Sequence, residues 1–575
     1  MSKNKRWSAA LAALLCFSLV ATACGAGGGA EPAPAAGEKP AASSDSGAAG
    51  TPEAPAADAG PYLGKYDPPI EISTVRIVGE LKFKEGEDID NNQWTRSLSE
   101  RLGIKVNNQW VVKNEQGAEK MNVTIASGDL PDFYQVNATQ LHQLVEAGQV
   151  MDITDIYEKH ATPLVKGFMN DATNALASAT FGGKLMAFPS PGSTLDAAPI
   201  LWIRKDWLDK LGLPEPKSMA DVLATSEAFT TKDPDGNGQN DTYGLALSKN
   251  LFGTNGGSGA YGALEGFMNG YNAYPQTWVK TADGTLGFGS VQPEMKTALA
   301  ALQTLFKNGQ IDREFGVKDE AKAGELAASG KVGMTYGAMW ISLDMLKNSK
   351  ANDPNADWQA YPLVNESGGM ANPQIPSLAV GSYYVVNKDA KHPEALIKML
   401  NLFAELQFGP DTPADVWQAH SKVDGIEIWP YYPFLVGPPN KNLGVHKNVV
   451  AALEKKDPSG LNAEETDAYN NSLAIEEGRG DPNAWGYDKV FGRKGSYEVI
   501  KRYVENNLLK PGEFYGVNTP TMAERSETLR KMEVETVTKI ILGDPIDTFD
   551  KFVADWKKLG GDQITKEVNE WYTSR

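Results

Sequence analysis

Short runs of β-branched and aromatic residues alternate with amphipathic helical segments along most of this chain. The first such unit is a strand predicted over Ile70 to Val78, a helix through Trp94 to Leu102 and a strand at Ile104 to Val106. The same order recurs where a predicted strand precedes a predicted helix, at Pro199 to Ile203 with Asp206 to Leu211 and at Val332 to Tyr336 with Trp340 to Leu346. This alternation predicts an α/β fold with layers of helices on sheets. No fixed-period repeat is visible, which disfavours solenoids and propellers.

The last part of the chain, from Glu524 to Trp571, has the apolar spacing of helices. Its apolar residues recur mostly three or four positions apart, at Met532, Val534, Val537, Ile540 and Ile541 and again at Phe549, Phe552, Val553, Trp556 and Leu559. Side chains at this spacing share one face of a helix, so we expect packed helices to close the chain.

The N-terminal segment has the pattern of an export signal. Basic residues near the start precede an apolar run from Trp7 to Val20, and the small residues Ala21-Thr22-Ala23 follow. The apolar run is short for a membrane-spanning helix and ends at a cleavage pattern, which favours a removable signal peptide over residues 1–23. No second apolar run approaches membrane-spanning length, so we expect the folded part to lie outside the bilayer.

Cys24 directly follows this leader and is the last cysteine of the chain. Two cleavage patterns compete here. Ala21-Thr22-Ala23 fits an ordinary A-x-A secretory site, whereas Leu19 to Cys24 resembles the lipobox of bacterial lipoproteins, in which the cysteine takes a diacylglycerol. The usual leucine three positions before the cysteine is Ala21 here. The position of Cys24 favours lipidation and anchoring to the outer face of the cell membrane.

Composition limits the class of the exported chain. From Gly25 to Pro61 the residues are mainly Ala, Gly, Pro, Ser and acidic, which predicts a flexible linker over residues 24–61. The formal charge of −18 argues against nucleic acid or an anionic lipid surface as a partner. Apolar residues make up 41% of the chain and no disulfide is possible after Cys24, so we expect a large packed core in more than one lobe.

Several segments between Tyr62 and Arg575 resemble the bacterial extracellular solute-binding lipoproteins of ABC importers, in the maltose-binding-protein-like group (family 1, oligosaccharide type). The order of these segments matches as well. They are Ala126 to Asp132, Gly183 to Pro189, Leu201 to Pro214, Gly330 to Trp340, Lys391 to Ala395 and Leu559 to Tyr572.

The resemblance implies a type II fold of two α/β lobes joined by a hinge that the chain crosses three times. By position, we predict crossings near Asn174 to Phe181, near Ala379 to Tyr384 and near Gly516 to Thr519. The N-terminal lobe would then comprise residues 62–178 and 384–515, and the C-terminal lobe residues 179–383 and 516–575.

The resemblance also implies a function. The lobes would close around a carbohydrate, and the closed form would deliver it to the transmembrane subunits of an ABC permease. We expect a monomer that binds its ligand and is not an enzyme. A surface carbohydrate-active enzyme is the principal alternative, because a glycosidase needs only two suitably separated carboxylates. A ligand-sensing lipoprotein that reports to a membrane receptor is a third interpretation.

The segment Asp233 to Asp241 resembles the first part of an EF-hand calcium loop. Oxygen-bearing side chains fall at loop positions one, three, five and nine, and Gly238 stands at the sixth position, where the sharp turn occurs. Position twelve is Gly244 instead of the bidentate Glu, so the loop is no complete EF-hand. We predict a structural Ca²⁺ ion; a metal-free Asx turn is the alternative. The predicted ligands are Asp233, Asp235, Asn237, Gln239 and Asp241.

Aromatic residues are the main candidates for ligand contacts, because sugars present apolar C–H faces that stack on flat rings. Trp340 follows a predicted strand whose carboxyl end should open toward the cleft, and related sugar binders place an aromatic residue there. Tyr134 and Asn137 occupy a matching position in the first lobe. Further candidates are Tyr271, Trp278, Trp429 and Tyr431, with polar contacts from Asp88, Asn91 and Asn92. Each of these also fits an ordinary core or turn position.

Overall fold

The computed structural model describes residues 62–79, 81–172, 174–253, 260–378 and 380–574. The predicted signal peptide, Cys24 and the linker up to residue 61 lie outside these described residues. Within the described ranges, no helix combines the length and the apolar character that crossing a bilayer requires.

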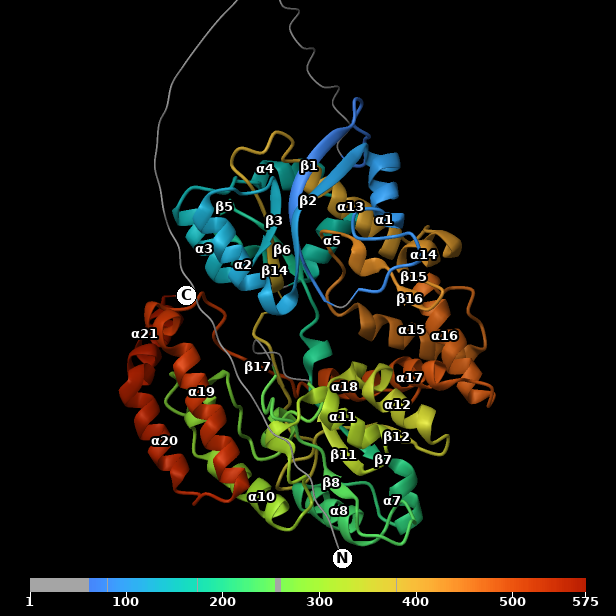
Figure 1. Cartoon of the computed structure of the whole chain (residues 1–575), viewed down its shortest axis with the longest axis vertical. Helices are drawn as coiled ribbons and strands as arrows, with labels where there is room; N and C mark the ends of the chain where they lie inside the picture. The colour runs from blue at the N-terminus through green and yellow to red at the C-terminus, as the bar shows by residue number, and fades with distance from the viewer. Residues whose placement is uncertain (1–61, 80, 173, 254–259, 379, 575) are drawn as a thin grey trace, which may run out of the picture. The chain divides into compact units, whose positions relative to one another are not determined.

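Buried apolar side chains gather in two separate clusters, which define two lobes. The first cluster contains side chains from Tyr66 to Phe188 and from Tyr383 to Val436. The second contains side chains from Leu195 to Ile375 and from Leu443 to Val568. Strands and helices contribute to both clusters, so each lobe is an α/β unit with its own core (Figure 1).

The first lobe is built around two short sheets. Strand β1 (Ile70–Val78) runs parallel to β2 (Ile104–Lys113). Strand β14 (Val380–Val386) returns from far along the chain and pairs antiparallel with β3 (Phe133–Val136) and β6 (Phe188–Pro191). The other elements of this lobe are α1 (Gln93–Ser97), α2 (Asn114–Ser127), α3 (Ala138–Glu146), α4 (Thr154–His160), α5 (Pro163–Asp171), α6 (Ala175–Ser178), β4 (Thr180–Phe181), β5 (Lys184–Leu185), α13 (Ala395–Phe408), α14 (Ala414–Ser421), β15 (Lys422–Val423), β16 (Ile426–Glu427) and the 3-10 helix η7 (Trp429–Tyr431).

The second lobe contains a four-stranded sheet in the order β12, β7, β11, β8. Every residue of the central strands β7 (Ile200–Arg204) and β11 (Val332–Gly337) is buried, which explains why neither strand alternates apolar with polar residues. The other elements are α7 (Lys205–Leu211), α8 (Met219–Thr231), β8 (Tyr243–Leu245), α9 (Glu265–Asn269), β9 (Trp278–Lys280), β10 (Leu286–Phe288), α10 (Glu294–Lys307), α11 (Glu320–Ala328), the 3-10 helix η6 (Met339–Leu343), α12 (Met345–Asn352), β12 (Trp358–Tyr361), β13 (Gln374–Ile375), α15 (Lys441–Lys455), α16 (Ala463–Glu476), α17 (Pro482–Phe491), α18 (Ser496–Glu505), β17 (Lys510–Pro511), α19 (Pro520–Leu542), α20 (Thr548–Trp556) and α21 (Asp562–Thr573).

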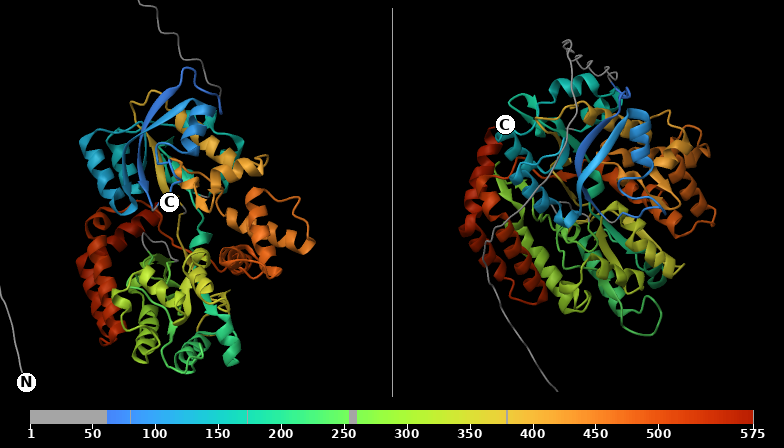
Figure 2. Two further views of the ribbon diagram at one scale, coloured as in Figure 1. Left: turned by 45° about the vertical axis from the view of Figure 1, so that its right-hand side comes forward. Right: turned by 45° about the horizontal axis from the view of Figure 1, so that its top comes forward.

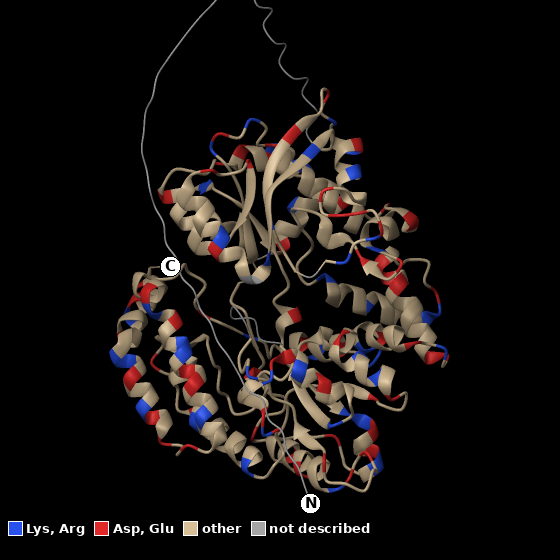
Figure 3. Ribbon diagram, viewed as in Figure 1, with Lys and Arg blue, Asp and Glu red and all other residues tan. Residues whose placement is uncertain are grey.

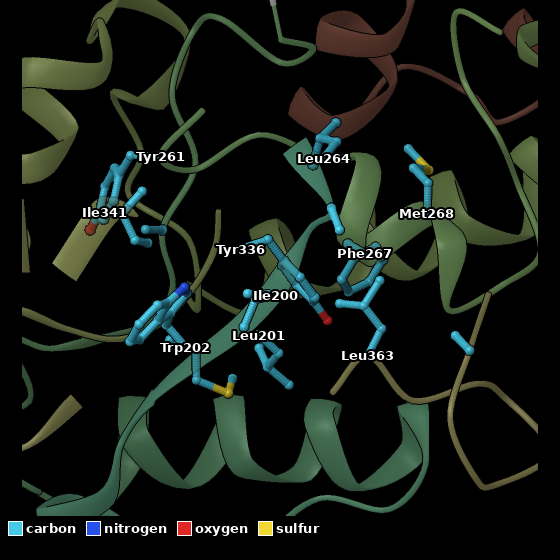
Figure 4. Close-up of a cluster of buried hydrophobic side chains, with 14 of the residues drawn as sticks. Ile200, Leu201, Trp202, Tyr261, Leu264, Phe267, Met268, Tyr336, Ile341 and Leu363 are labelled. Carbon is cyan, nitrogen blue, oxygen red and sulfur yellow. The ribbon is translucent and has the colours of Figure 1, made fainter. Parts of the chain in front are cut away.

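Aromatic side chains fill the core around these central strands (Figure 4). Trp202 of β7 is fully buried, and Phe267 of α9 meets Tyr336 of β11 edge-on with ring centres 6.1 Å apart. A Cβ atom at Gly333 would lie 2.2 Å from the ring of Phe229. The close approach of α8 to β11 therefore requires glycine at position 333.

The three helices α19, α20 and α21 close the chain, which confirms the helical prediction for this region. Helix α19 packs against α10, and the turned views show the two side by side (Figure 2). Basic and acidic residues are interspersed along the three helices (Figure 3), with ion pairs one turn apart such as Lys566 and Glu570 at 3.7 Å. The apolar residues of these helices join the second cluster.

The chain passes between the two clusters three times. Membership changes between Phe188 and Leu195, between Ile375 and Tyr383 and between Val436 and Leu443. The first change follows β6, and the second precedes β14, so both crossings adjoin the strands of the first lobe. We call these segments the first, second and third crossings.

The structure corrects two of the predicted crossings. The predicted crossing at residues 174–181 lies inside the first lobe, so the second lobe starts after β6 and not at residue 179. Residues 516–519 are no crossing, because Tyr503 before them and Met522 after them belong to the same cluster. The second half of the predicted segment 384–515 therefore packs in the second lobe. An amphipathic pattern shows that a helix has a buried face, but it does not show which sheet that face covers.

Local predictions agree more closely with the structure. The first predicted strand coincides with β1, and the predicted strand at Ile104 continues as β2 to Lys113. The predicted helix from Trp340 to Leu346 is wrong, because that segment is the 3-10 helix η6 followed by the start of α12.

Candidate functional site

A cavity of about 480 Å³ lies where the two lobes meet, beside the first and third crossings. Its volume falls within the range of small-molecule sites, which measure about 300 to 1,000 Å³. We call it the interlobe cavity. From the first lobe it is lined by Phe408, Trp417, Lys422, Glu427 and Trp429, and from the second by Asp196, Leu343, Glu464, Asp467 and Tyr487, among others.

Aromatic side chains form much of the cavity wall. Phe408 ends α13, Trp417 lies on α14 and Trp429 lies in η7, whereas Tyr487 comes from α17 on the opposite side. Trp429 keeps 39% of its surface exposed, and its indole N–H donates a hydrogen bond of 2.8 Å to Glu427 Oε2. This bond fixes the rim of the ring, while the exposed surface can cover the apolar C–H face of a sugar.

The polar part of the wall is predominantly acidic. Four carboxylic acids line the cavity together with two lysines, and no arginine is found among its described lining residues. Burial raises the pKa of Asp467, and the nearby charge of Lys422 partly offsets this effect. The Lys422 ammonium lies 5.1 Å from the centre of the Tyr487 ring, and Lys441 forms an ion pair with Glu464. The two cations are thus engaged by neighbouring side chains.

Asp196 connects the first crossing to the second lobe. Its carboxylate accepts a hydrogen bond of 2.9 Å from the amide of Asn442 on α15 and another from the hydroxyl of Tyr497 on α18. Burial raises the pKa of Asp196, and the hydrogen bond from Tyr497 opposes this shift. The first and third crossings are therefore tied together at the edge of the cavity.

One buried donor in the wall has no partner. Gln407 Oε1 accepts a hydrogen bond of 2.9 Å from Ser421 Oγ, but its Nε2 has no acceptor among the described residues. A ligand rich in hydroxyl groups could satisfy this donor and also donate to the carboxylates, because a hydroxyl acts in both directions. The cavity thus combines ring surfaces with separate donors and acceptors.

Two of the predicted ligand residues lie at or near this cavity. Trp429 lines it directly. Trp340 lies in η6 with 37% of its surface exposed, and its neighbour Met339 lines the cavity. Trp340 itself is not part of the lining.

The other first-lobe candidates have structural roles in the described residues. Tyr134 is fully buried on β3 and presents no free surface in this structure. Asn137 caps α3 by accepting from Gln140 N at 2.9 Å, and Asn92 is fully buried as the cap of α1. Asp88 accepts from the backbone N–H of Asn91 at 2.8 Å, as expected for a turn. None of the four lies in the interlobe cavity.

The second-lobe candidates separate in a different way. Tyr271 is buried against Phe267, with ring centres 5.5 Å apart. Tyr431, a candidate in the first lobe, is also buried. Trp278 is also largely buried, but it lines a different cavity within the second lobe. These positions show that an aromatic residue near a cleft often fills the core instead.

The predicted calcium loop folds as a tight turn. Asp233 accepts hydrogen bonds of 3.0 Å from the backbone N–H groups of Gly236, Asn237 and Gly238. The ammonium of Lys331 lies 2.5 Å from Asp241 and 3.5 Å from Asp235. The oxygen donors fit Ca²⁺ in kind. However, no three His, Cys, Asp or Glu side chains in the described part of the chain converge on a metal position.

Most residues of the interlobe cavity were missed by sequence reasoning. Asp196 precedes β7, whereas Asp467 and Tyr487 belong to helices that the prediction placed in the other lobe. The one local signal is Glu427 two positions before Trp429, an acid and an aromatic ring in one short segment. The remaining residues are brought together only by the crossings.

Comparison with protein families identifies one match. The family described as bacterial extracellular solute-binding protein matches residues 93–405. The polygalacturonan/rhamnogalacturonan-binding protein YtcQ of Bacillus subtilis strain 168 is 25% identical over 463 residues, which cover 79% of this chain and 82% of that protein. Lipoprotein LipO of the same organism is 23% identical over 521 residues, covering 87% and 92% of the two chains.

A solved structure shares the fold. The substrate-binding protein FusA of an S. pneumoniae ABC transporter, solved as an EF-hand mutant in complex with fructo-nystose, superposes with a TM-score of 0.58. The aligned part covers 88% of this chain and 99% of FusA at 18% sequence identity. The type II fold is thus shared with a protein of low sequence identity.

Proposed function

The chain belongs to the bacterial extracellular solute-binding proteins, and we propose that it captures an oligosaccharide between its lobes for an ABC importer. The observation that carries this proposal is the interlobe cavity, in which both lobes contribute ring surfaces and carboxylates. Carbohydrate recognition commonly combines such surfaces, because a sugar has apolar faces and a polar rim. YtcQ is described as a polygalacturonan/rhamnogalacturonan-binding protein and FusA was solved with fructo-nystose, and both support a carbohydrate ligand.

Capture would proceed by a change in the angle between the lobes. The three crossings are short segments between two independent cores, and such segments act as hinges in two-lobed binding proteins. A ligand that contacts Trp429 on one side and Tyr487 on the other would favour the closed form, because only that form gives it both sets of contacts. The closed form would then dock on the permease.

Direct binding measurements test this proposal. Purified protein from residue 62 onward would be titrated by calorimetry with neutral and acidic oligosaccharides of two to six units, and the reaction mixtures would be analysed for products. We expect stoichiometric binding and unchanged oligosaccharides. Failure to bind any carbohydrate would refute the proposed function.

We propose binding without catalysis. The matching family is described as a solute-binding protein, and the relatives YtcQ and FusA are described as binding proteins, which supports binding without turnover. Turnover of any oligosaccharide in the product analysis would establish the enzyme instead.

An importer subunit and a sensor differ in their partner. Deletion of the gene should abolish uptake of the bound carbohydrate in an importer. Retained uptake with loss of a transcriptional response would identify a ligand-sensing lipoprotein.

We also propose that Cys24 carries a lipid that holds the protein at the outer face of the cell membrane. The leader pattern and the absence of any later cysteine support this assignment. The relative LipO is itself described as a lipoprotein. Replacement of Cys24 by Ala should move the protein from the membrane fraction to the medium. Full retention in the membrane fraction would contradict the assignment.

The loop from Asp233 to Asp241 is proposed to hold a structural Ca²⁺ ion. Five oxygen-bearing side chains at alternate positions and the turn around Asp233 support the proposal, and the EF-hand of FusA is a precedent within the fold. The Lys331 ammonium now neutralises Asp235 and Asp241, so the ion would compete with it. A melting temperature that does not change between excess calcium and a chelator would refute the proposal.

A further inference from the structure

A second cavity of about 380 Å³ lies inside the second lobe, beside the second crossing. Ser377 and Leu378 of that crossing line it, together with residues of α19. Its aromatic walls are formed by Trp278, Phe288, Phe514 and Trp556. We call it the crossing cavity.

Two buried glutamates from distant parts of the chain line this cavity. Glu265 begins α9 and is 4% exposed, whereas Glu533 lies in the middle of α19 and is 2% exposed. Glu265 Oε1 accepts a hydrogen bond of 2.6 Å from the backbone N–H of Gly253, and Glu533 Oε2 accepts one of 3.4 Å from Gln276. The second oxygen of each carboxyl, Glu265 Oε2 and Glu533 Oε1, is buried without a hydrogen-bond partner of good geometry among the described residues, and the Ser290 side chain lies beside Glu533 and lowers its pKa.

The charge around these glutamates is little compensated. Arg530 is the one basic residue among the described residues that line the cavity, and its guanidinium lies 3.2 Å from Glu527. Burial raises the pKa of each glutamate to about 7, since the charged form loses its hydration. The negative charge of Glu320 raises the pKa of Glu265 further. The charge of Glu265 in turn raises the pKa of Glu533, whereas the positive charge of Arg530 lowers it.

We infer that Glu265 and Glu533 make the crossing cavity a subsite for uncharged, hydroxyl-rich sugar units and exclude uronates from it. This inference rests on the proposed function and specifies its substrate class. Two unpartnered carboxyl oxygens in one cavity require donors, and sugar hydroxyl groups supply them. A uronate would bring a further carboxylate beside this pair, where like charges repel strongly in a poorly solvated space.

The walls support the same ligand class. Trp278 and Phe288 have ring centres 5.4 Å apart, and Phe288 stacks on Trp556 at 5.3 Å. These rings provide an apolar surface for the C–H face of a sugar, and the side chain of Gln276 adds an amide group to the wall. Proteins that recognise carboxylate ligands typically use an arginine fork. The one arginine among the described lining residues, Arg530, is exposed and pairs with Glu527 on the same helix.

The experiment compares sugars that differ only in the oxidation state of C6. The first pair is α-1,4-galactotriose with trigalacturonate, and the second is β-1,4-mannotriose with trimannuronate; kestose is an additional neutral probe. Each is titrated by calorimetry into the wild-type chain, the double variant Glu265→Gln/Glu533→Gln and the control Glu535→Gln. Glu535 lies on the same helix with an exposed side chain.

We expect the wild-type chain and the control to bind a neutral member at least tenfold more tightly than its acidic partner. The double variant should reduce this ratio at least tenfold, because glutamine neither repels a carboxylate nor changes the shape of the site. The wild-type ratio should also rise between pH 6 and pH 8 as the two glutamates ionise, which gives a second test if the double variant does not fold.

Three results would overturn the inference. Equal or tighter binding of the acidic members would refute it while leaving the proposed function intact. If neither the double substitution nor a change in pH altered the preference for neutral over acidic sugars, these glutamates would not determine that preference. Binding of none of the five probes would count against both the inference and the proposed function.

Discussion

Replacing Glu533 by Gln should increase the free energy of unfolding at alkaline pH. Glu533 is buried in the middle of α19, and the burial raises its pKa from 4.5 to about 7. The folded state therefore holds a proton that the unfolded state releases at lower pH. The stabilisation that the protonated Glu533 contributes is complete below the pKa that this carboxyl has in the unfolded state. It is lost as the pH rises past the pKa of the carboxyl in the folded state.

The size of the effect follows from the pKa difference. Each pKa unit corresponds to about 1.4 kcal/mol, so the wild-type chain should lose about 3 kcal/mol of stability by pH 8 through this one group. Less than about 1 kcal/mol of that loss occurs by pH 5. Because Gln resembles the protonated glutamate and does not titrate, the stability gained by Glu533→Gln should grow over this interval.

Urea unfolding at half-unit steps from pH 5 to pH 8 measures the difference between the two proteins. The exposed Glu535→Gln variant serves as the control, and we expect its stability to follow the wild type within about 0.5 kcal/mol at every pH. A difference between Glu533→Gln and the wild type that stays constant with pH would refute the reasoning, because Glu533 would then titrate alike in both states.

Three further outcomes are expected. Trp429→Ala should weaken oligosaccharide binding about tenfold, since one stacking ring contributes about 1.5 kcal/mol, whereas Trp110→Ala on β2 should leave affinity unchanged in the same calorimetric titration. Gly333→Ala should lower stability by about 1 to 3 kcal/mol through the clash with Phe229, and Gly381→Ala, where a Cβ meets nothing within 4 Å, should not do so in urea unfolding. Lys331→Met should increase the rise in melting temperature caused by Ca²⁺, because the competing ammonium is removed; an unchanged or smaller rise would contradict this role.

Local structure followed from local sequence. The strands β1, β7 and β11 and the closing helices were predicted near their observed positions, because side-chain periodicity and turn residues act over a few neighbouring positions. The 3-10 helix at Met339 to Leu343 is an exception. Its residues follow a buried strand without a side-chain cap, and tertiary packing there overrides the helical pattern.

The candidate site was predictable only in part. Trp429 was named as a further aromatic candidate and lines the interlobe cavity, whereas Tyr134, which was proposed from its matching position in the first lobe, is fully buried. The two differ in the neighbours that cover them, and these neighbours come from remote segments. Glu265 and Glu533 show the same limit, since 268 positions separate two residues that line one cavity.

The sequence by itself predicted the α/β alternation and, through the family resemblance, the number of crossings, whereas the export leader and the role of Cys24 stay predictions from the sequence. These properties depend on composition and on order along the chain. Only the tertiary structure decided where the crossings occur and that α15 to α18 pack in the second lobe. It also decided which carboxyl groups are desolvated by burial, as Glu533 is. The physical reason is that burial depends on which surfaces meet, and an amphipathic helix can cover either of two apolar sheets equally well.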